Sequence, residues 1–175
     1  MNTSLQGSTN HKNARPPAFM LPILKLPLLL YRTGLGWLLG YRFMLLTHVG
    51  RRSGKVRQTV LAVLSFDPKT KEIKAISAWS ASDWYKNILK LPALQVDTGS
   101  TRYVPVYDSL PPEEIAALFE AYCSKHPIFS RIVCRIPGWK WDSSHEEWLE
   151  LAKTLRGVAF QPKESEAAEF RLLDP

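Results

Sequence analysis

The chain has 175 residues, of which 45% are hydrophobic, and these values indicate one folded domain with a sizeable core. Its formal net charge of +7 favours anionic partners: a phosphorylated cofactor, a lipid surface or a nucleic acid. Residues 1–66 contain no Asp or Glu, so we expect the positive charge to gather on one face. No recognition-helix or RNA-binding signature is visible, and we therefore expect no nucleic-acid partner.

The cysteines and the first residues bear on the compartment. Cys123 and Cys134 form neither a CxxC pair nor a zinc pattern with histidine, which predicts two reduced cysteines in a cytoplasmic protein. No signal peptide is recognisable, because the first residues are polar and the apolar stretch lacks a small-residue cleavage site. No cluster of side chains has metal-ligand spacing, so the sequence predicts no metal site.

The N-terminal part divides into a polar tail and an apolar segment. Residues 1–17 are rich in Asn, Ser, Thr, Lys and Pro, a composition typical of disorder. Residues 19–46 are Leu-rich, but prolines and cations interrupt them too often for a good membrane-spanning helix. Three interpretations stay open for residues 19–40: an amphipathic helix at the inner face of a membrane, a helix packed on the core, or a lid over an apolar pocket. The positions at helical spacing are Leu28, Leu29, Arg32, Leu35, Gly36 and Leu39, with Trp37 nearby.

The most distinctive segment is residues 48–57, His-Val-Gly-Arg-Arg-Ser-Gly-Lys-Val-Arg. Apolar residues lead into it and β-branched residues lead out, which predicts a β-hairpin with a glycine-containing turn. The turn carries a cationic cup, which we define as Arg51, Arg52, Lys55 and Arg57. Such a cup suits phosphate, because arginine offers a planar fork, lysine a point charge, and turn amides an anion nest. A solvated hairpin tip is the alternative, and the spacing matches neither the Walker pattern nor the dinucleotide fingerprint.

The remaining strands are expected to be mainly antiparallel. Residues 41–49 and 56–66 flank the cup, and residues 72–78 follow a turn at 67–71. A further hairpin joins 93–97 to 101–107, and a last strand covers 158–161. A meander is the economical topology for these strands.

Helices are expected after the third strand and in the last third of the chain. A short helix starts at Trp84 with Ser82 or Asp83 as its cap, and its rings are either core or a wall for a flat ring system. Three more helices are predicted at 111–125, at 129–136, and from Ser143 or Ser144 to residue 155. Residues 163–175 are charged and read as a C-terminal tail.

No set of nucleophile, base and orienting residue is visible. The histidines are scattered, and the paired acids sit at helix starts, where the helix dipole explains them. If the chain is an enzyme, a bound cofactor with a flat ring and a phosphate tail would carry the chemistry.

Residues 45–59 together with residues 83–88 resemble the deazaflavin-dependent nitroreductase family, within the flavin/deazaflavin oxidoreductase superfamily. The resemblance spans about residues 28–136 and rests on Gly-Arg-x-Ser-Gly-x-x-Arg and Trp-Tyr-x-Asn. It implies an α+β fold: a split β-barrel of mainly antiparallel strands with flanking helices, in one domain over residues 18–162. It also implies the cofactor F420, and hydride transfer from reduced F420 to quinones, nitro compounds or other electrophilic acceptors.

By position, the resemblance assigns roles to individual residues. The turn would hold the phosphate and tail, with Thr59 on the adjoining strand. The family's acceptor pocket corresponds to His126, Phe129 and Ile132, where His126 is either a proton donor or a helix-end histidine; no catalytic residue is assigned. The expected cofactor-binding residues are Arg51, Arg52, Ser53, Gly54, Lys55, Val56, Arg57 and Thr59 for the tail, Ser77, Ala78 and Trp79 bordering the ring, and Trp84, Tyr85 and Asn87 behind it.

The sequence also departs from the family. The loop after the third strand is shorter than in the characterised nitroreductases and carries Trp79. Since the superfamily includes members that bind FMN, haem, biliverdin or fatty acids, the alternative function is a non-catalytic or FMN-dependent split-barrel protein that binds a flavin, tetrapyrrole or lipid. Superfamily members occur as monomers and homodimers.

Overall fold

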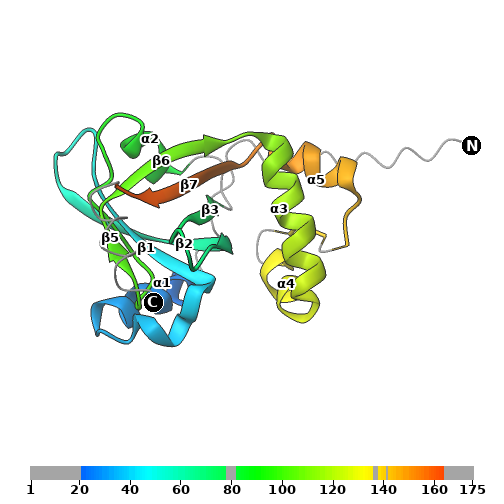
Figure 1. The fold of residues 1–175 in the computed structure, drawn as a ribbon, viewed down its shortest axis with the longest axis horizontal. Helices are drawn as coiled ribbons and strands as arrows, with labels where there is room; N and C mark the ends of the chain where they lie inside the picture. Colours follow the sequence, from blue (N-terminus) through cyan, green and yellow to red (C-terminus); the bar gives the residue numbers. More distant parts are fainter. Residues whose placement is uncertain (1–20, 78–81, 136–137, 141, 164–175) are drawn as a thin grey trace, which may run out of the picture.

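The computed structural model describes residues 21–77, 82–135, 138–140 and 142–163, and its centre is a seven-stranded antiparallel sheet (Figure 1). The strand order is β5–β4–β1–β2–β3–β7–β6. The strands are β1 Phe43–Val49, β2 Val56–Phe66, β3 Ile73–Ser77, β4 Gln95–Asp97, β5 Arg102–Tyr103, β6 Pro105–Leu110 and β7 Arg156–Pro162.

The sheet curves into a nearly closed barrel. Its two edge strands, β5 and β6, are consecutive in the chain and only Val104 separates them, so the two edges of the sheet meet at this residue. The Val104 carbonyl also accepts a hydrogen bond from the Lys163 amide at 3.3 Å. The predicted split β-barrel of mainly antiparallel strands is confirmed. Closure of this kind leaves few unpaired strand edges exposed.

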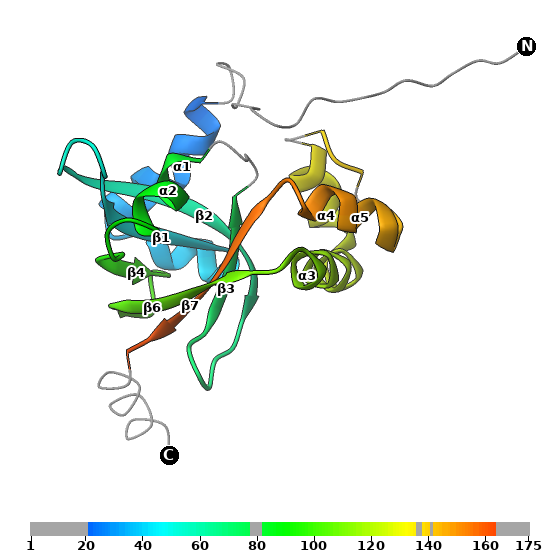
Figure 2. The ribbon, with the colours of Figure 1, turned by 90° about the horizontal axis from the view of Figure 1, so that it is seen from above.

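The predicted meander holds only for β1, β2 and β3. β4 returns to pair with β1, and β7 lies between β3 and β6. β7 follows α3, α4 and α5, which lie together at one side of the barrel, so the chain leaves the sheet after β6 and returns to pair beside it (Figure 2).

Helices cover the barrel from two sides. In Figures 1 and 2, α3, α4 and α5 lie together at one side of the barrel, and α1 and α2 lie at the other. The helices are α1 Leu21–Arg32, the 3-10 segment η3 Gly36–Arg42, α2 Asp83–Ile88, α3 Pro112–Lys125, α4 Pro127–Arg135 and α5 His145–Ala152. All predicted helices after the third strand are confirmed, and α5 begins with a capping box between Ser144 and Glu147.

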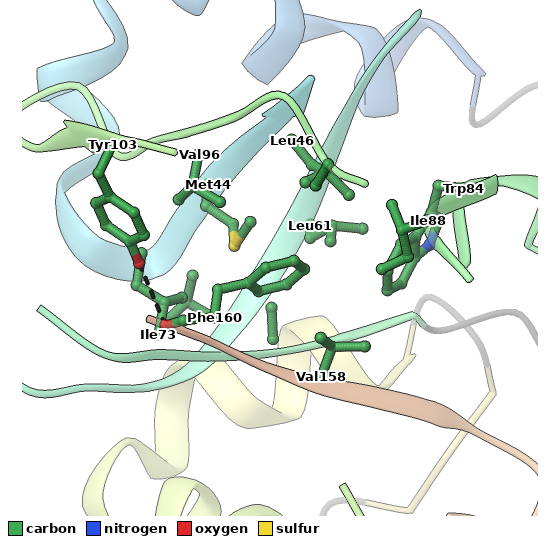
Figure 3. Packing of buried hydrophobic residues seen from close by; sticks show 13 residues of the cluster. Met44, Leu46, Leu61, Ile73, Trp84, Ile88, Val96, Tyr103, Val158 and Phe160 are labelled. Carbon is green, nitrogen blue, oxygen red and sulfur yellow. Dashed lines mark hydrogen bonds between the residues drawn. The ribbon is translucent and has the colours of Figure 1, made fainter. Parts of the chain in front are cut away.

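Two hydrophobic clusters hold the fold together. Inside the barrel, Phe160, Met44 and Leu46 are fully buried, and the Tyr103 hydroxyl donates to the Phe160 carbonyl at 3.3 Å (Figure 3). The second cluster joins β3 to α3 and α5, where the Phe119 and Trp148 rings stack at 4.8 Å. Burial of this apolar area is the main stabilising contribution to the free energy of folding.

The N-terminal segment is not the single helix that its spacing predicted. α1 ends at Arg32, Gly34 takes a φ of +76°, and η3 follows at a different angle. The Tyr31 hydroxyl donates to the Phe43 carbonyl at 2.8 Å, and the Tyr41 ring stacks on Phe66 at 3.9 Å. The segment is therefore packed on the barrel. Among the described residues, no helix has the length and apolar character needed to cross a membrane.

Glycine is required where this segment meets the barrel. Gly99, in the β4–β5 turn, has a φ of +85°, and a Cβ there would collide with the backbone of Gly36 and Trp37. The turn can therefore lie against η3 only if residue 99 has no side chain. The predicted tails at 1–17 and beyond residue 163 lie outside the described residues.

Candidate functional site

The cationic cup stands on the predicted hairpin. β1 pairs with β2 from Phe43–Ala62 to Val49–Val56, and residues 50–55 form the turn. The Gly50 amide donates to the Lys55 carbonyl at 2.9 Å, and the Gly54 amide donates to the Gly50 carbonyl at 2.8 Å. Gly54 has a φ of +63°, which a glycine adopts without strain. The local sequence therefore determines the turn.

The expected nest of turn amides is not free to bind an anion. The amides of Gly50, Ser53 and Gly54 all donate to carbonyls within the turn, and the Arg51 amide donates to Asn87 Oδ1. The Gly54 amide proton closes the turn and is not available to an anion. An anion at this site would be bound mainly by side chains.

A cavity of about 310 Å³ lies beside the turn and reaches the start of α2. Its lining comes from the hairpin and from the first two turns of α2, two segments far apart in the sequence. The lining residues are His48, Gly50, Arg51, Arg52, Ser53, Arg57, Gln58, Thr59, Asp83, Trp84 and Asn87.

Arg51 ties the turn to α2. Its Nη2 lies 3.0 Å from Asp83 Oδ1, and its Nη1 donates to Asn87 Oδ1 at 2.9 Å. The hydrogen bond from Arg51 lowers the pKa of Asp83 below its ordinary value, so this carboxylate stays charged. Asp83 therefore pairs with Arg51, whereas Ser82 occupies the N-cap position of α2 without a capping hydrogen bond from its side chain.

The other cations of the cup keep their charge unpaired. Within the described ranges, no salt bridge involves Arg52, Lys55 or Arg57. Arg52 and Arg57 line the cavity and are exposed, whereas Lys55 lies at the turn without lining it. Two guanidinium groups with unused donors therefore face one cavity, which is a favourable arrangement for an anion.

His48 lies at the back of the cavity and is 2% exposed. Asn87 Nδ2 lies 3.2 Å from His48 Nδ1, and Thr59 Oγ1 lies 3.3 Å from His48 Nε2. Burial lowers the pKa of His48, and the charge of Arg57 lowers it further, against a raising contribution from a backbone hydrogen bond at Val49. A hydrogen-bonded chain thus runs from Arg51 through Asn87 and His48 to Thr59.

The Trp84 ring belongs both to the core and to the wall of the cavity, the two positions that the sequence left open. It is 4% exposed and lies beside Ile88 at the edge of the barrel core (Figure 3), and it also lines the cavity. Its indole Nε1 is buried and has no hydrogen-bond partner among the described residues. Tyr85 next to it bonds to Ser109 at 2.9 Å through its hydroxyl and does not line the cavity.

The predicted cofactor-binding residues fall into three groups. Seven of them line the cavity together: Arg51, Arg52, Ser53, Arg57, Thr59, Trp84 and Asn87. Gly54, Lys55, Val56, Ser77 and Tyr85 do not line it, and Ser77 is buried at the end of β3, where its hydroxyl bonds to Ser82. Ala78 and Trp79 lie outside the described residues.

Sequence reasoning missed His48, Gly50, Gln58 and Asp83 as part of the site. For His48 a signal existed: in a strand the side chains alternate, so His48 shares its face with the buried Met44 and Leu46. A histidine on the buried face of a strand, next to a cationic turn, needs hydrogen-bond partners from elsewhere in the chain.

The predicted acceptor-pocket residues lie away from this cavity. His126 ends α3, and its carbonyl accepts hydrogen bonds from Ser130. Phe129 lies beneath the Arg42 guanidinium at 4.6 Å, and Ile132 is 60% exposed on α4. None of the three lines the cavity. In the part of the chain that the structure describes, no group of three or more His, Cys, Asp or Glu side chains could hold a metal ion.

Comparisons with known proteins give one informative match. The model of a family described as F420H(2)-dependent quinone reductase matches residues 32–132, more than half of the chain and the whole of the cavity lining. A search of curated proteins finds no match.

Solved structures give distant matches. A chain described as a domain-swapped dimer is 15% identical, with 69% of this chain and 80% of that chain covered and a TM-score of 0.43. A pyridoxamine 5'-phosphate oxidase-related, FMN-binding protein from Nostoc punctiforme is 15% identical, with coverages of 83% and 81% and a TM-score of 0.41. A protein from Clostridium acetobutylicum related to general stress protein 26 is 9% identical, with coverages of 76% and 82% and a TM-score of 0.39.

Proposed function

Because the chain belongs to the F420H(2)-dependent quinone reductase family, we propose that the cavity beside the β1–β2 turn binds the phosphate-containing tail of F420. Membership of this family implies an oxidoreductase that transfers hydride from F420H2 to quinone-like acceptors. The activity and the cofactor expected from the sequence are thereby confirmed at the level of the family. The residues that hold the cofactor are our proposal.

The cavity fits an anionic tail. Its volume of about 310 Å³ falls within the usual range of small-molecule sites. The single observation that carries the proposal is the pair Arg52 and Arg57, which line the cavity without a carboxylate partner in the described ranges. The buried, unpaired Nε1 of Trp84 is a further donor in the lining residues, and such an orphaned group favours a bound acceptor.

The protein's own residues would bind and orient the cofactor. When bound, reduced F420 supplies the hydride, and the chain supplies the cations, the cavity wall and the exclusion of water. We assign the tail to the turn residues and Thr59, with Asn87 holding Arg51 and His48 in place, and the border of the ring to Ser77 at the end of β3. Lys55 stays in this proposal as an exposed cation that steers the anion toward the cup.

The acceptor is assigned to the α4 side of the N-terminal segment. The contact between Arg42 and Phe129 at 4.6 Å brings the end of η3 against α4. Ile132 is exposed on α4, so an apolar acceptor could contact His126, Phe129 and Ile132 on its way to the ring. An exposed aliphatic side chain beside a partly exposed aromatic ring suits a quinone.

The N-terminal segment also presents an apolar face, which we assign to peripheral contact with the inner face of a membrane. Large apolar side chains are exposed there beside two arginines, as in interfacial helices. If this is right, replacing Trp37 and Leu38 with serine should abolish flotation with anionic vesicles, and equal flotation of both proteins would refute it. The exposed large apolar side chains of this segment are Leu26, Leu29, Leu35, Trp37, Leu38 and Tyr41, and Arg32 and Arg42 are also exposed.

The decisive experiment is a fluorescence titration of the ligand-free protein with oxidised F420, with FMN as the parallel titration. We expect saturable binding of F420 and weak binding of FMN. Tight FMN binding without F420 binding would overturn the cofactor proposal and support the FMN-dependent alternative. Absence of binding to either would favour a split-barrel carrier of a lipid or tetrapyrrole.

A further inference from the structure

We propose that the Arg51–Asn87 pair holds His48 as the neutral tautomer with its proton on Nε2, and that His48 thereby makes the Thr59 hydroxyl a hydrogen-bond donor to the bound ligand. His48 and Asn87 are then positioning residues, and Thr59 makes the contact. The identity of the ligand as F420 rests on the proposed function, whereas the tautomer follows from contacts within the protein.

The first step fixes the side-chain amide of Asn87. Its Oδ1 accepts from the Arg51 amide at 3.1 Å and from Arg51 Nη1 at 2.9 Å. Both of these groups are donors only, and a guanidinium cannot accept. The opposite orientation of the amide would place its NH2 group against two N–H groups. Asn87 therefore directs Nδ2, a donor, toward His48.

The second step fixes the proton on His48. Asn87 Nδ2 lies 3.2 Å from His48 Nδ1 and an amide NH2 group only donates, so Nδ1 offers its lone pair to it. The backbone hydrogen bond at Val49, which raises the pKa of His48, is the contact that competes with this arrangement. A neutral imidazole with a free Nδ1 carries its proton on Nε2. The Nε2–H group then donates to Thr59 Oγ1 at 3.3 Å. Protonation of Nδ1 would set two donors against each other in a buried place, because Arg51 prevents the amide from turning.

The third step follows the proton of Thr59. Its oxygen accepts from His48, so the hydroxyl proton is directed elsewhere. In the part of the chain that the structure describes, no protein acceptor is bonded to this proton, and Thr59 lines the cavity. The pairing of Thr59 with Leu46 in the β1–β2 ladder holds the backbone in place. The hydroxyl is therefore an oriented donor at the cavity wall.

The consequence is that the site favours ligands that place a hydrogen-bond acceptor atom next to Thr59. With Arg52, Arg57 and the Thr59 hydroxyl, this wall of the cavity presents donors to the ligand. A ligand oxygen completes the hydrogen-bonded chain, whereas a ligand N–H group at the same place would meet a proton. The hydrogen-bonded chain from Arg51 to Thr59 would thus contribute specificity in addition to the attraction between charges, since a ligand donor that faces the Thr59 proton loses its own hydrogen bond.

The tautomer can be measured on the wild-type, ligand-free protein. Long-range 1H–15N NMR of the imidazole rings should show His48 with a protonated Nε2 and an unprotonated Nδ1. In Asn87→Asp the new carboxylate would accept from Nδ1–H, so the pKa of His48 should rise and Nδ1 should become protonated. A wild-type His48 that carries its proton on Nδ1 would overturn the proposal.

The donor role of Thr59 is tested by affinity for oxidised F420. We expect Thr59→Val to weaken binding by about 2- to 12-fold, whereas Thr59→Ser, which keeps the hydroxyl, stays near the wild type. Thr70→Val, in the turn between β2 and β3, is the matched control for loss of a threonine hydroxyl. Equal affinities of Thr59→Val and Thr59→Ser would overturn the donor role. If the wild-type protein failed to bind F420 while His48 showed the Nε2–H tautomer, the cofactor proposal would be refuted. The hydrogen-bonded chain from Arg51 to Thr59 would still be supported.

Discussion

Removal of the two unpaired arginines is the sharpest test of the cup. In the double variant Arg52→Ala, Arg57→Ala, the cavity loses both guanidinium groups that have no salt bridge in the described ranges. The Arg51 contacts to Asp83 and Asn87 remain, so the junction between the turn and α2 should stay intact. The variant therefore separates binding of an anion from the integrity of the site.

The magnitude follows from the kind of contact that is lost. A charge-assisted hydrogen bond contributes about 1.5–3 kcal/mol, and two on one phosphate share part of that energy. A total loss of about 3 kcal/mol corresponds to an increase of about 150-fold in the Kd for F420. Since both side chains are exposed, the free energy of unfolding should change by less than about 0.5 kcal/mol.

The assay is the same fluorescence titration, paired with chemical denaturation of each protein. The double variant Lys69→Ala, Lys153→Ala removes the same formal charge from positions outside the cavity and serves as the control. Its affinity for F420 should stay within about twofold of the wild type, because charges beyond about 10 Å are screened by salt. If the arginine double variant bound F420 as tightly as this control, the assignment of the phosphate to the cup would be wrong.

Three further outcomes concern stability. Because burial lowers the pKa of His48 in the folded state, the unfolded state binds its proton first, so the free energy of unfolding should fall as the pH drops below about 6.5. His48→Gln should flatten this slope in denaturation curves, and an unchanged slope would refute the assignment of the slope to His48. Gly99→Ala should lower the melting temperature more than Gly54→Ala, since both have positive φ but only Gly99 also meets the backbone of η3; equal shifts would refute that contact. Ser144→Ala should cost about 1 kcal/mol in the free energy of unfolding and Ser143→Ala much less, because only Ser144 forms the capping box; calorimetry distinguishes the two.

The sequence by itself determined the local parts of the site. Apolar and β-branched runs on either side of a glycine-containing turn predicted β1 and β2 within two residues, and placed the cations of the cup at the turn. The same turn together with the Trp-Tyr-x-Asn segment predicted the family, which the family model confirms. The signals for the hairpin act over a few residues, where backbone sterics and side-chain alternation decide the local structure.

Only the tertiary structure decided how distant segments complete the site. Arg51 meets Asn87 36 residues away, and Asn87 meets His48 39 residues away, so neither contact leaves a periodic pattern in the sequence. The amides of Gly50, Ser53 and Gly54 donate within the turn and the Arg51 amide donates to Asn87, so side chains are the main donors to a ligand. The place of β7 beside β3 and the meeting of β5 and β6 at Val104 likewise depend on pairing across the barrel. Local sequence fixes which groups stand on each element, whereas their hydrogen-bond partners are fixed only when packing of the core brings the elements together.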